Sequence, residues 1–237
     1  MLELRAVSKA FGGIVVADQI DLKLAPGEAL GIIGPNGAGK STLLNLITGM
    51  VKPDRGQVIF DGRDITRAAP EERSRAGIGR SFQIPQPFDS LTAFENLLVA
   101  AMFGGQLSEH EAVQHCGNML ALTGLEARAN TPAGALPLLD RKRLEMARAL
   151  ATRPRLLLLD EIAGGLTDAE CQSLIATIRD IGAEGVAIVW IEHIVHALLA
   201  VVGRLVALDF GRVVMDGEPN AVMQSDEVQT IYMGVPA

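Results

Sequence analysis

The chain has 237 residues, of which 49% are hydrophobic and 21% charged, and these fractions exclude an intrinsically disordered protein. The formal net charge of −7 argues against a protein that binds nucleic acids non-specifically, because such proteins are normally basic. The length fits one large domain, or one domain with a subdomain inserted into it.

Three further features concern the cellular compartment. The first residues do not resemble a secretory signal, because Glu3 stands where a signal peptide has basic residues. The best candidate for a membrane span, residues 197–209, is short and is interrupted by a glycine and an arginine. Cys116 and Cys171 are isolated from each other, so we expect free thiols and a cytosolic protein.

The first part of the chain predicts an antiparallel layer. Residues 2–7 alternate between apolar and polar side chains, as a half-buried strand does. A turn at Phe11-Gly12-Gly13 leads to a second strand region, residues 14–24, which ends at Pro26-Gly27. These two strands are expected to pair with each other before the chain enters a buried sheet.

The most informative stretch follows directly. Residues 29–33 are a short apolar run typical of a buried strand, and residues 40–48 have helical periodicity and a stop at Gly49. Between strand and helix the sequence matches G-x-x-x-x-G-K-[ST], the phosphate-binding P-loop. The matching residues are Gly34, Pro35, Asn36, Gly37, Ala38, Gly39, Lys40, Ser41 and Thr42.

The residue types of this loop indicate its chemistry. Its glycines allow the backbone to turn tightly and to bring N–H groups up to phosphate oxygens, at the positive end of a helix. Lys40 supplies a positive charge for β- and γ-phosphates, and the hydroxyl of Ser41 is placed to bind Mg²⁺. Phe11 allows two interpretations, either packing at the sheet edge or stacking on an adenine ring.

The middle of the chain changes character after a strand predicted over residues 78–83, which ends at Gln83. Two prolines follow, and then helical patterns, one of which begins at Ser108 with a capping box. We therefore expect a mostly helical insert, residues 84–150, in an α/β core formed by residues 1–83 and 151–237. The expected helices of this part are residues 69–76, 92–103, 108–125 and 141–151, and His110 and His115 are expected to be solvated.

A second strong signal is the run Leu156-Leu157-Leu158-Leu159-Asp160-Glu161. Four consecutive leucines predict a strand that is buried on both faces, as in a parallel sheet. An aspartate at the carboxyl end of such a strand lies where α/β sheets bind ligands, so Asp160 is a candidate to hold Mg²⁺. Glu161 is a candidate to polarise an attacking water. The alternative for this acidic pair is simple helix capping.

The last third continues the α/β pattern. A helix is predicted over residues 168–181 and a buried strand over residues 186–191, with His193 just past the end of that strand. His193 is therefore expected at the same sheet edge as the P-loop, where it could contact a γ-phosphate. Residues 205–216 predict a hairpin through Phe210-Gly211, and short helices follow it. The string Asp209-Phe210-Gly211 imitates a kinase motif, but no H-R-D loop precedes it.

Taken together, these residues resemble the ATP-binding subunits of ABC transporters over nearly the whole chain. The resemblance implies that Gln83 is the family's glutamine that reaches Mg²⁺ and the attacking water, and that Asp160 is the Mg²⁺-site aspartate. It also implies that Glu161 is the catalytic glutamate and His193 the switch histidine, and it favours the adenine-stacking role for Phe11. The phrase from Gly77 to Ala100 is most similar to subunits of branched-chain amino-acid importers.

The resemblance has two departures. The family signature LSGGQ should precede the helix at residues 141–151, but Leu136-Pro137-Leu138-Leu139-Asp140 stands there. The hydroxyl and the glycine N–H groups that this segment offers to a partner's γ-phosphate are largely absent, although Asp140 suits the N-cap of that helix. The second departure is Thr167, where an aspartate is typical, with Ile162 in place of the usual proline.

The resemblance thus implies an α/β fold with a P-loop NTPase core sheet, an N-terminal antiparallel layer and an inserted helical subdomain. It implies an ATPase that uses ATP and Mg²⁺ at the cytoplasmic face of a membrane to power import of branched-chain amino acids or a related solute. The implied partners are a second ATP-binding subunit, membrane permease subunits and, indirectly, a solute-binding protein, with no nucleic acid. The alternative is a regulatory or non-transport ABC ATPase with little turnover.

Overall fold

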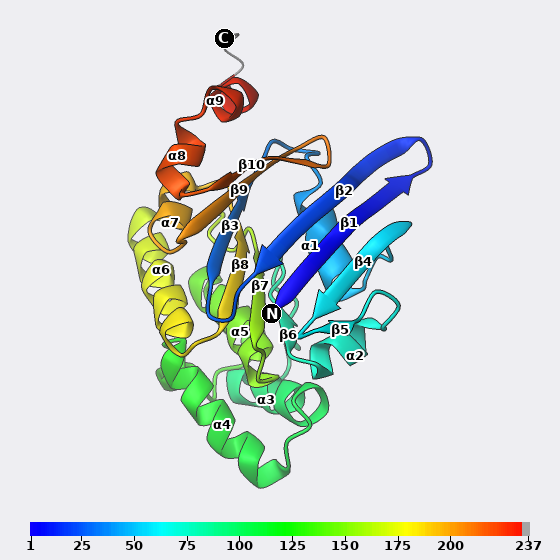
Figure 1. Ribbon diagram of the computed structural model, residues 1–237. Coiled ribbons are helices and arrows are strands. Elements are labelled where there is room, and N and C mark those ends of the chain that lie inside the picture. The colour runs from blue at the N-terminus through cyan, green and yellow to red at the C-terminus, as the bar shows by residue number, and fades with distance from the viewer. Residues whose placement is uncertain (234–237) are drawn as a thin grey trace. The chain divides into compact units, whose positions relative to one another are not determined.

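The computed structural model describes residues 1–233 (Figure 1). The chain divides into two compact units. The first unit contains Met1–Arg73 and the chain from Val189 onward, and the second contains Ser74–Ile188. The short helix α2 (Pro70–Arg75) and the strand β8 (Ala187–Ile191) each run across a boundary between the units.

The first unit contains an antiparallel sheet with the strand order β2-β1-β4-β5, visible in Figure 1. Its strands are β1 (Leu2–Phe11), β2 (Ile14–Leu24), β4 (Arg55–Phe60) and β5 (Arg63–Asp64). Leu2 pairs with Leu24 on one side and with Phe60 on the other, and all three are buried. The predicted antiparallel layer is therefore confirmed. Its first strand is longer than predicted, because the pairing continues to Phe11 and Ile14 around the glycine turn.

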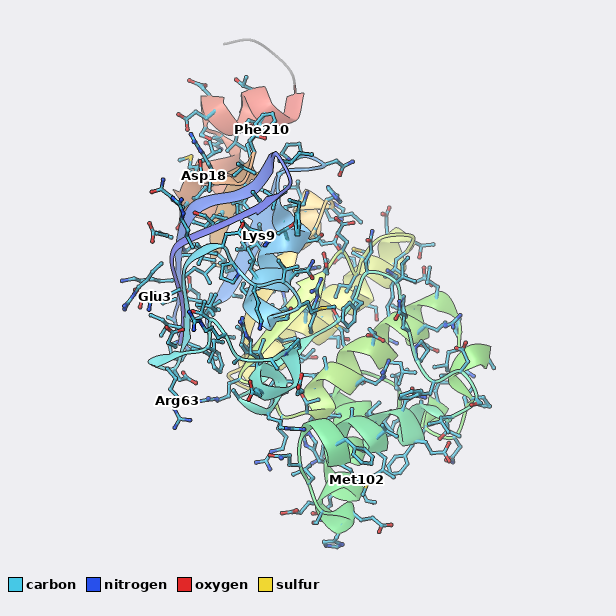
Figure 2. The ribbon with its side chains drawn as sticks, turned by 90° about the vertical axis from the view of Figure 1, so that its right-hand side faces the viewer. Glu3, Lys9, Asp18, Arg63, Met102 and Phe210 are labelled. Atoms are coloured by element: carbon cyan, nitrogen blue, oxygen red, sulfur yellow. The ribbon has the colours of Figure 1, made fainter. Side chains whose placement is uncertain are left out.

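Parallel pairing begins in the same unit with β3 (Ala29–Ile33), which lies beside β9 (Arg204–Asp209). β9 forms the predicted hairpin with β10 (Arg212–Gly217). Figure 2 shows Phe210 at the hairpin turn and Asp18 nearby, and the N–H of Asp18 donates to the carbonyl of Gly211 at 2.8 Å. The short helices predicted after the hairpin are also present. The helices of this part are α7 (Val195–Leu199), α8 (Pro219–Met223) and α9 (Asp226–Met233).

Helix α1 (Lys40–Thr48) follows β3 and ends at Gly49, whose φ of 81° needs glycine. Leu43, Leu44 and Ile47 are buried, as the helical periodicity predicts. Its C-terminal carbonyls have an unusual partner, because the buried guanidinium of Arg73 donates to the carbonyls of Leu46 at 2.7 Å and Ile47 at 2.9 Å. A buried cation at this position completes the last turn of α1 and complements the negative end of the helix.

The second unit contains the parallel strands β6 (Ile78–Arg80) and β7 (Leu156–Asp160), in which Arg80 pairs with Leu158. The four leucines of β7 are completely buried, which confirms the strand predicted from them. The predicted end of β6 is wrong: the strand stops at Arg80, although the N–H of Ser81 still donates to the carbonyl of Leu158 at 2.9 Å.

The remainder of the second unit is helical, with a shared apolar core that includes Leu97, Leu120 and Leu144. The predicted helix over residues 92–103 is two pieces, α3 and a π-helical turn, and the capping box at Ser108 is confirmed. The helical elements are α3 (Ala93–Val99), η1 (Ala100–Gly104), α4 (Glu109–Leu122), η2 (Glu126–Arg128), η3 (Ala133–Ala135), α5 (Leu138–Ala151) and α6 (Asp168–Ala183). The proposed division between a core and an insert at residues 84–150 stays a prediction.

Expectations about the two cysteines, about His115 and about a membrane span can be compared with the structure. Cys116 and Cys171 are free, as predicted, and burial raises the pKa of the Cys116 thiol to about 11. His115 is not solvated as predicted: it is half-buried, its Nε2 lies 3.3 Å from the carbonyl of Leu150, and burial lowers its pKa. Within residues 1–233, no helix combines the length and the apolar character that crossing a membrane requires.

Candidate functional site

The P-loop connects β3 to α1 in a conformation that only glycine tolerates at two places. Gly39 has φ 102°, and a Cβ there would lie 2.3 Å from the carbonyl oxygen of Val16. A Cβ on Gly34 would lie 2.4 Å from the carbonyl oxygen of Leu208. Both contacts are far shorter than van der Waals distances, so the backbone of the loop lies directly against its neighbours. The glycines of the motif are therefore required by the close approach as well as by the turn.

The polar groups of the loop are arranged for an anion. Among the described residues, no acceptor is present for the N–H groups of Asn36, Gly37 and Gly39. These donors lie at the positive end of α1, which is where phosphate groups bind helices. The buried side chain of Lys40 folds back onto the loop and donates to the carbonyls of Gly34 at 2.7 Å and Pro35 at 3.0 Å. The side chain of Ser41 is exposed at the first turn of α1.

Phe11 lies at the end of β1 with half of its surface exposed. The ammonium group of Lys9, labelled in Figure 2, lies 5.3 Å from the centroid of its ring and 2.7 Å from a carboxylate oxygen of Asp54. Lys9 therefore covers part of the ring by a cation–π contact. The rest of the side chain is exposed, as stacking on a base requires.

His193 is the second residue after β8 and is exposed. Its backbone N–H donates to the carboxylate of Glu192 at 3.1 Å, and Glu192 is only 2% exposed. The local backbone around His193 is thus held by a buried acid, while the imidazole remains accessible to a ligand.

In the second unit, Asp160 ends β7 and forms an ion pair with Arg80 at the end of β6. The distance from Arg80 Nη2 to Asp160 Oδ2 is 2.8 Å, and the two side chains are only 9% and 8% exposed. The parallel pairing of β6 and β7 brings these two strand ends together. The alternative interpretation of Asp160 as a helix cap does not fit, because none of the helices described in the chain is capped by it.

Glu161 follows Asp160 and takes a left-handed backbone conformation, with φ 48°. Its Oε2 accepts a hydrogen bond from Nε2 of Gln83 at 2.7 Å. A non-glycine residue at positive φ is uncommon and is often associated with functional sites. The structure therefore brings together two of the predicted catalytic residues, Gln83 and Glu161, which are 78 positions apart in sequence.

The segment at the family's signature position opens helix α5. The expectation that Asp140 caps this helix is wrong: the helix starts earlier, at Leu138, and its N-cap is Pro137, which offers no side-chain cap. Asp140 lies in the first turn, where an acid suits the helix dipole, and its carboxylate lies 3.5 Å from Arg128 and 3.6 Å from Arg143. Leu138 is 45% exposed, so this helix start presents apolar surface.

Thr167, which stands where the family has an aspartate, has a structural role that the sequence did not predict. It is the N-cap of α6 and forms a capping box with Glu170, in which each side chain bonds to the other residue's backbone N–H. Ile162, the other departure, is almost completely buried.

Sequence reasoning missed Arg80, although it stands three positions before Gln83 in the same phrase. An arginine at the end of a short strand is usually solvated, and only the pairing of β6 with β7 shows that it meets Asp160. Within residues 1–233, no three His, Cys, Asp or Glu side chains come together as a metal site.

The family model "ABC transporter" matches residues 17–164. The chain is 33% identical to the branched-chain amino acid transport ATP-binding protein BraF of Pseudomonas aeruginosa, over 99% of this chain and 98% of BraF. It is also 33% identical to the lipopolysaccharide export ATP-binding protein LptB of Acidithiobacillus ferridurans, over 99% of this chain and 97% of LptB.

Solved structures agree with this result. An ATP-binding cassette of an ABC transporter in its ADP conformation matches with a TM-score of 0.91 and 31% identity, over 99% of each chain. A nucleotide-free cassette matches with a TM-score of 0.90 and 30% identity, also over 99% of each chain. The predicted α/β fold is thereby confirmed. The chain belongs to the ABC transporter family, as a nucleotide-binding subunit with ATPase activity.

Proposed function

We propose that this subunit hydrolyses ATP to power import of a branched-chain amino acid or a related small solute. The support is the similarity to BraF along essentially the whole of both chains, together with the matching phrase at residues 77–100. The equal similarity to LptB, an export protein, makes the direction and the solute the points that need a direct test.

Nucleotide binding is assigned first to the P-loop. The free N–H groups of Asn36, Gly37 and Gly39 and the dipole of α1 bind phosphate oxygens, and the remaining loop residues, Gly34, Pro35, Ala38 and Thr42, shape this cradle. When nucleotide binds, the ammonium group of Lys40 leaves the carbonyl oxygens of Gly34 and Pro35 and binds oxygens of the β- and γ-phosphates instead. Phe11 stacks on the adenine ring with its exposed surface.

The metal role is assigned to Ser41, Gln83 and Asp160. A hydroxyl, an amide carbonyl and a carboxylate supply the hard oxygen atoms that Mg²⁺ prefers, so these residues fit the ion. When bound, Mg²⁺ neutralises charge on the phosphates.

Hydrolysis is assigned to Glu161, which polarises the attacking water. The observation that carries this assignment is the 2.7 Å hydrogen bond from Gln83 to Glu161. This bond holds the carboxylate of Glu161 in place through Oε2. Gln83 and His193 respond to the γ-phosphate and transmit its presence to partner subunits, and the accessibility of both side chains suits that role.

The chain acts in a dimer of ATP-binding subunits. A related cassette that is 27% identical was solved as a dimer with ADP and phosphate. In such a dimer the signature segment of one subunit meets the ATP of the other. Because Leu136–Asp140 lacks the glycines and the hydroxyl for this contact, we propose a heterodimer whose second subunit carries an intact signature. This chain's own ATP is then the one that is hydrolysed.

The exposed surface after β6 is the proposed contact with a membrane partner. Phe82, Ile84 and Phe88 are exposed apolar side chains within residues 83–96 or next to them, and we assign this surface to contact with a membrane permease. This contact would hold the subunit at the cytoplasmic face of the membrane. An extracytoplasmic solute-binding protein delivers the solute to the permease and does not touch this chain.

The second candidate function is an ATP-dependent clamp with little turnover, which the altered signature favours. Proteoliposomes that contain the permease, both ATP-binding subunits and the binding protein distinguish the two. Import predicts that ATP drives uptake of radiolabelled leucine and that Glu161→Gln abolishes it while ATP still binds. Equal ATP-independent uptake by wild type and variant, or ATP binding without any turnover, would exclude the import assignment.

A further inference from the structure

Two consecutive acidic residues, Asp160 at the end of β7 and Glu161 just after it, are each held by a residue at or shortly after the end of β6. Arg80 binds Asp160, and Gln83 binds Glu161. The two contacts differ in their surroundings, because the Arg80–Asp160 pair is more than nine-tenths buried whereas Gln83 is exposed. The first contact is therefore shielded from water, and the second is open to exchange.

The guanidinium group of Arg80 is fixed from more than one side. Its carbon lies 4.9 Å from the centroid of the Phe82 ring, which stacks against it. Its strand is tied to β7 by the pairing of Arg80 with Leu158 and by the bond from Ser81 N–H to the carbonyl of Leu158. An arginine held in this way has little freedom to move away from Asp160.

The contact leaves the two oxygens of Asp160 in different states. Oδ2 accepts the hydrogen bond from Arg80, whereas Oδ1 accepts none from any described residue. Oδ1 is also absent from the buried polar atoms that lack a partner in residues 1–233, so it can be reached from outside. Oδ2 is thus occupied by the arginine, whereas Oδ1 is accessible.

We propose that Arg80 is a positioning residue for the metal site: it fixes the Asp160 carboxylate through Oδ2 and directs Oδ1 toward the nucleotide-bound metal ion. This inference rests on the proposed role of Asp160 in holding Mg²⁺. Residues that orient a metal-binding carboxylate commonly affect metal affinity although they do not touch the ion. A competing view is that the positive charge of Arg80 merely repels the metal, and the two views predict opposite effects.

The test uses the full chain and Mn²⁺ as the probe, with its binding to the protein–AMP-PNP complex followed by electron paramagnetic resonance. Arg80→Gln is expected to weaken Mn²⁺ binding about 10- to 100-fold, with nucleotide affinity in EDTA unchanged. Arg80→Lys, which keeps the charge but loses the planar fork, is expected to lie between wild type and Arg80→Gln. Its intermediate affinity also keeps the test valid if the glutamine variant does not fold by circular dichroism.

The matched control is Arg155→Gln, immediately before β7 of the same strand pair. Arg155 precedes β7, and its side chain donates to the carbonyl of Ala76, away from Asp160. It is expected to bind Mn²⁺ as wild type does. Unchanged or tighter Mn²⁺ binding by folded Arg80→Gln would overturn the inference. Asp160→Asn distinguishes a failure of the Arg80 inference from a failure of the proposed metal role of Asp160. If Asp160→Asn also leaves Mn²⁺ binding unchanged, the metal role of Asp160 is wrong. If Asp160→Asn weakens Mn²⁺ binding but Arg80→Gln does not, only the role of Arg80 is wrong.

Discussion

The starts of two helices, α1 and α5, differ in chemistry, although the resemblance of the sequence to the family predicts a contact with nucleotide phosphates at both. Before α1, three glycines give the backbone positive φ values, and N–H groups are left without acceptors among the described residues. Before α5, Pro137 with φ −64° is the N-cap, and Leu138 begins the helix with an exposed apolar side chain.

From this comparison we expect that a helix dipole alone does not make a phosphate site. Both helices have a positive N-terminal end, and both are anchored by buried side chains such as Leu44 and Leu144. They differ in whether a phosphate can reach the N–H groups. Glycine permits that approach, whereas proline removes a donor and leucine side chains cover the backbone.

The largest expected effect concerns α1. Lys40→Ala should lower ATP turnover by at least about 10²- to 10³-fold, because the lysine supplies charge where the transferring phosphoryl group develops it. Steady-state phosphate release with Mg²⁺ measures this loss, in the presence of the partner subunit. Lys52→Ala is the control, since this exposed lysine lies outside the P-loop. Normal turnover by Lys40→Ala would remove the assignment of the loop.

A gain of function tests the start of α5. Replacing Pro137, Leu138, Leu139 and Asp140 with Ser, Gly, Gly and Gln restores a hydroxyl and glycine N–H groups to the segment. We expect ATP turnover by this chain alone to rise by about 10-fold or more, because the segment can then bind the ATP of a second copy. The single change Pro137→Ala, which restores one donor only, serves as the comparison. No increase in turnover would mean that another feature blocks the homodimer.

The two helices should lose similar amounts of stability when a buried leucine is removed from either of them. Leu44→Ala in α1 and Leu144→Ala in α5 each empty a completely buried position and should each reduce the free energy of unfolding by about 2–5 kcal/mol. Urea denaturation followed by circular dichroism measures both. A small effect for one variant and a large effect for the other would show that the helices are anchored differently.

The smallest expected effect is a pH dependence in the unit that contains α5. Burial lowers the pKa of His115, so the unfolded chain binds a proton more readily than the folded chain. Stability is therefore unaffected well above pH 6.5, the ordinary pKa, and falls as the pH decreases through 6.5 toward the lower folded value. His115→Gln should shrink the loss of thermal stability between about pH 7 and pH 5, by about 2 °C or less. An unchanged profile in thermal scans would contradict this account of His115.

Much of this organisation could be predicted from local sequence. The P-loop glycines, the leucine strand β7 and the capping box of α4 depend on short-range patterns, and each was found where it was expected. The start of α5 was predicted wrongly because two local patterns overlap there. Asp140 suits an N-cap by residue type, but the helical leucines before it move the start of α5 back to Leu138.

Contacts between distant segments could not be predicted in this way. The Gln83–Glu161 and Arg80–Asp160 bonds join residues about 80 positions apart and depend on the register of β6 against β7. His115 was misjudged for a related reason, since its partner is a carbonyl of another helix, α5. The sequence predicts which residues belong to the candidate site, and the pairing of β6 with β7 determines which of them contact each other.

The most direct test of the contrast between the two helix starts is the mass of Glu161→Gln with Mg²⁺ and ATP, measured by light scattering. Glu161→Gln should bind ATP without hydrolysing it, so that any closed dimer accumulates. We expect a monomer with bound ATP, because Leu136–Asp140 cannot close over the ATP of a second copy. A stable homodimer of this variant would show that the segment still binds a partner's nucleotide and would contradict the proposed heterodimer.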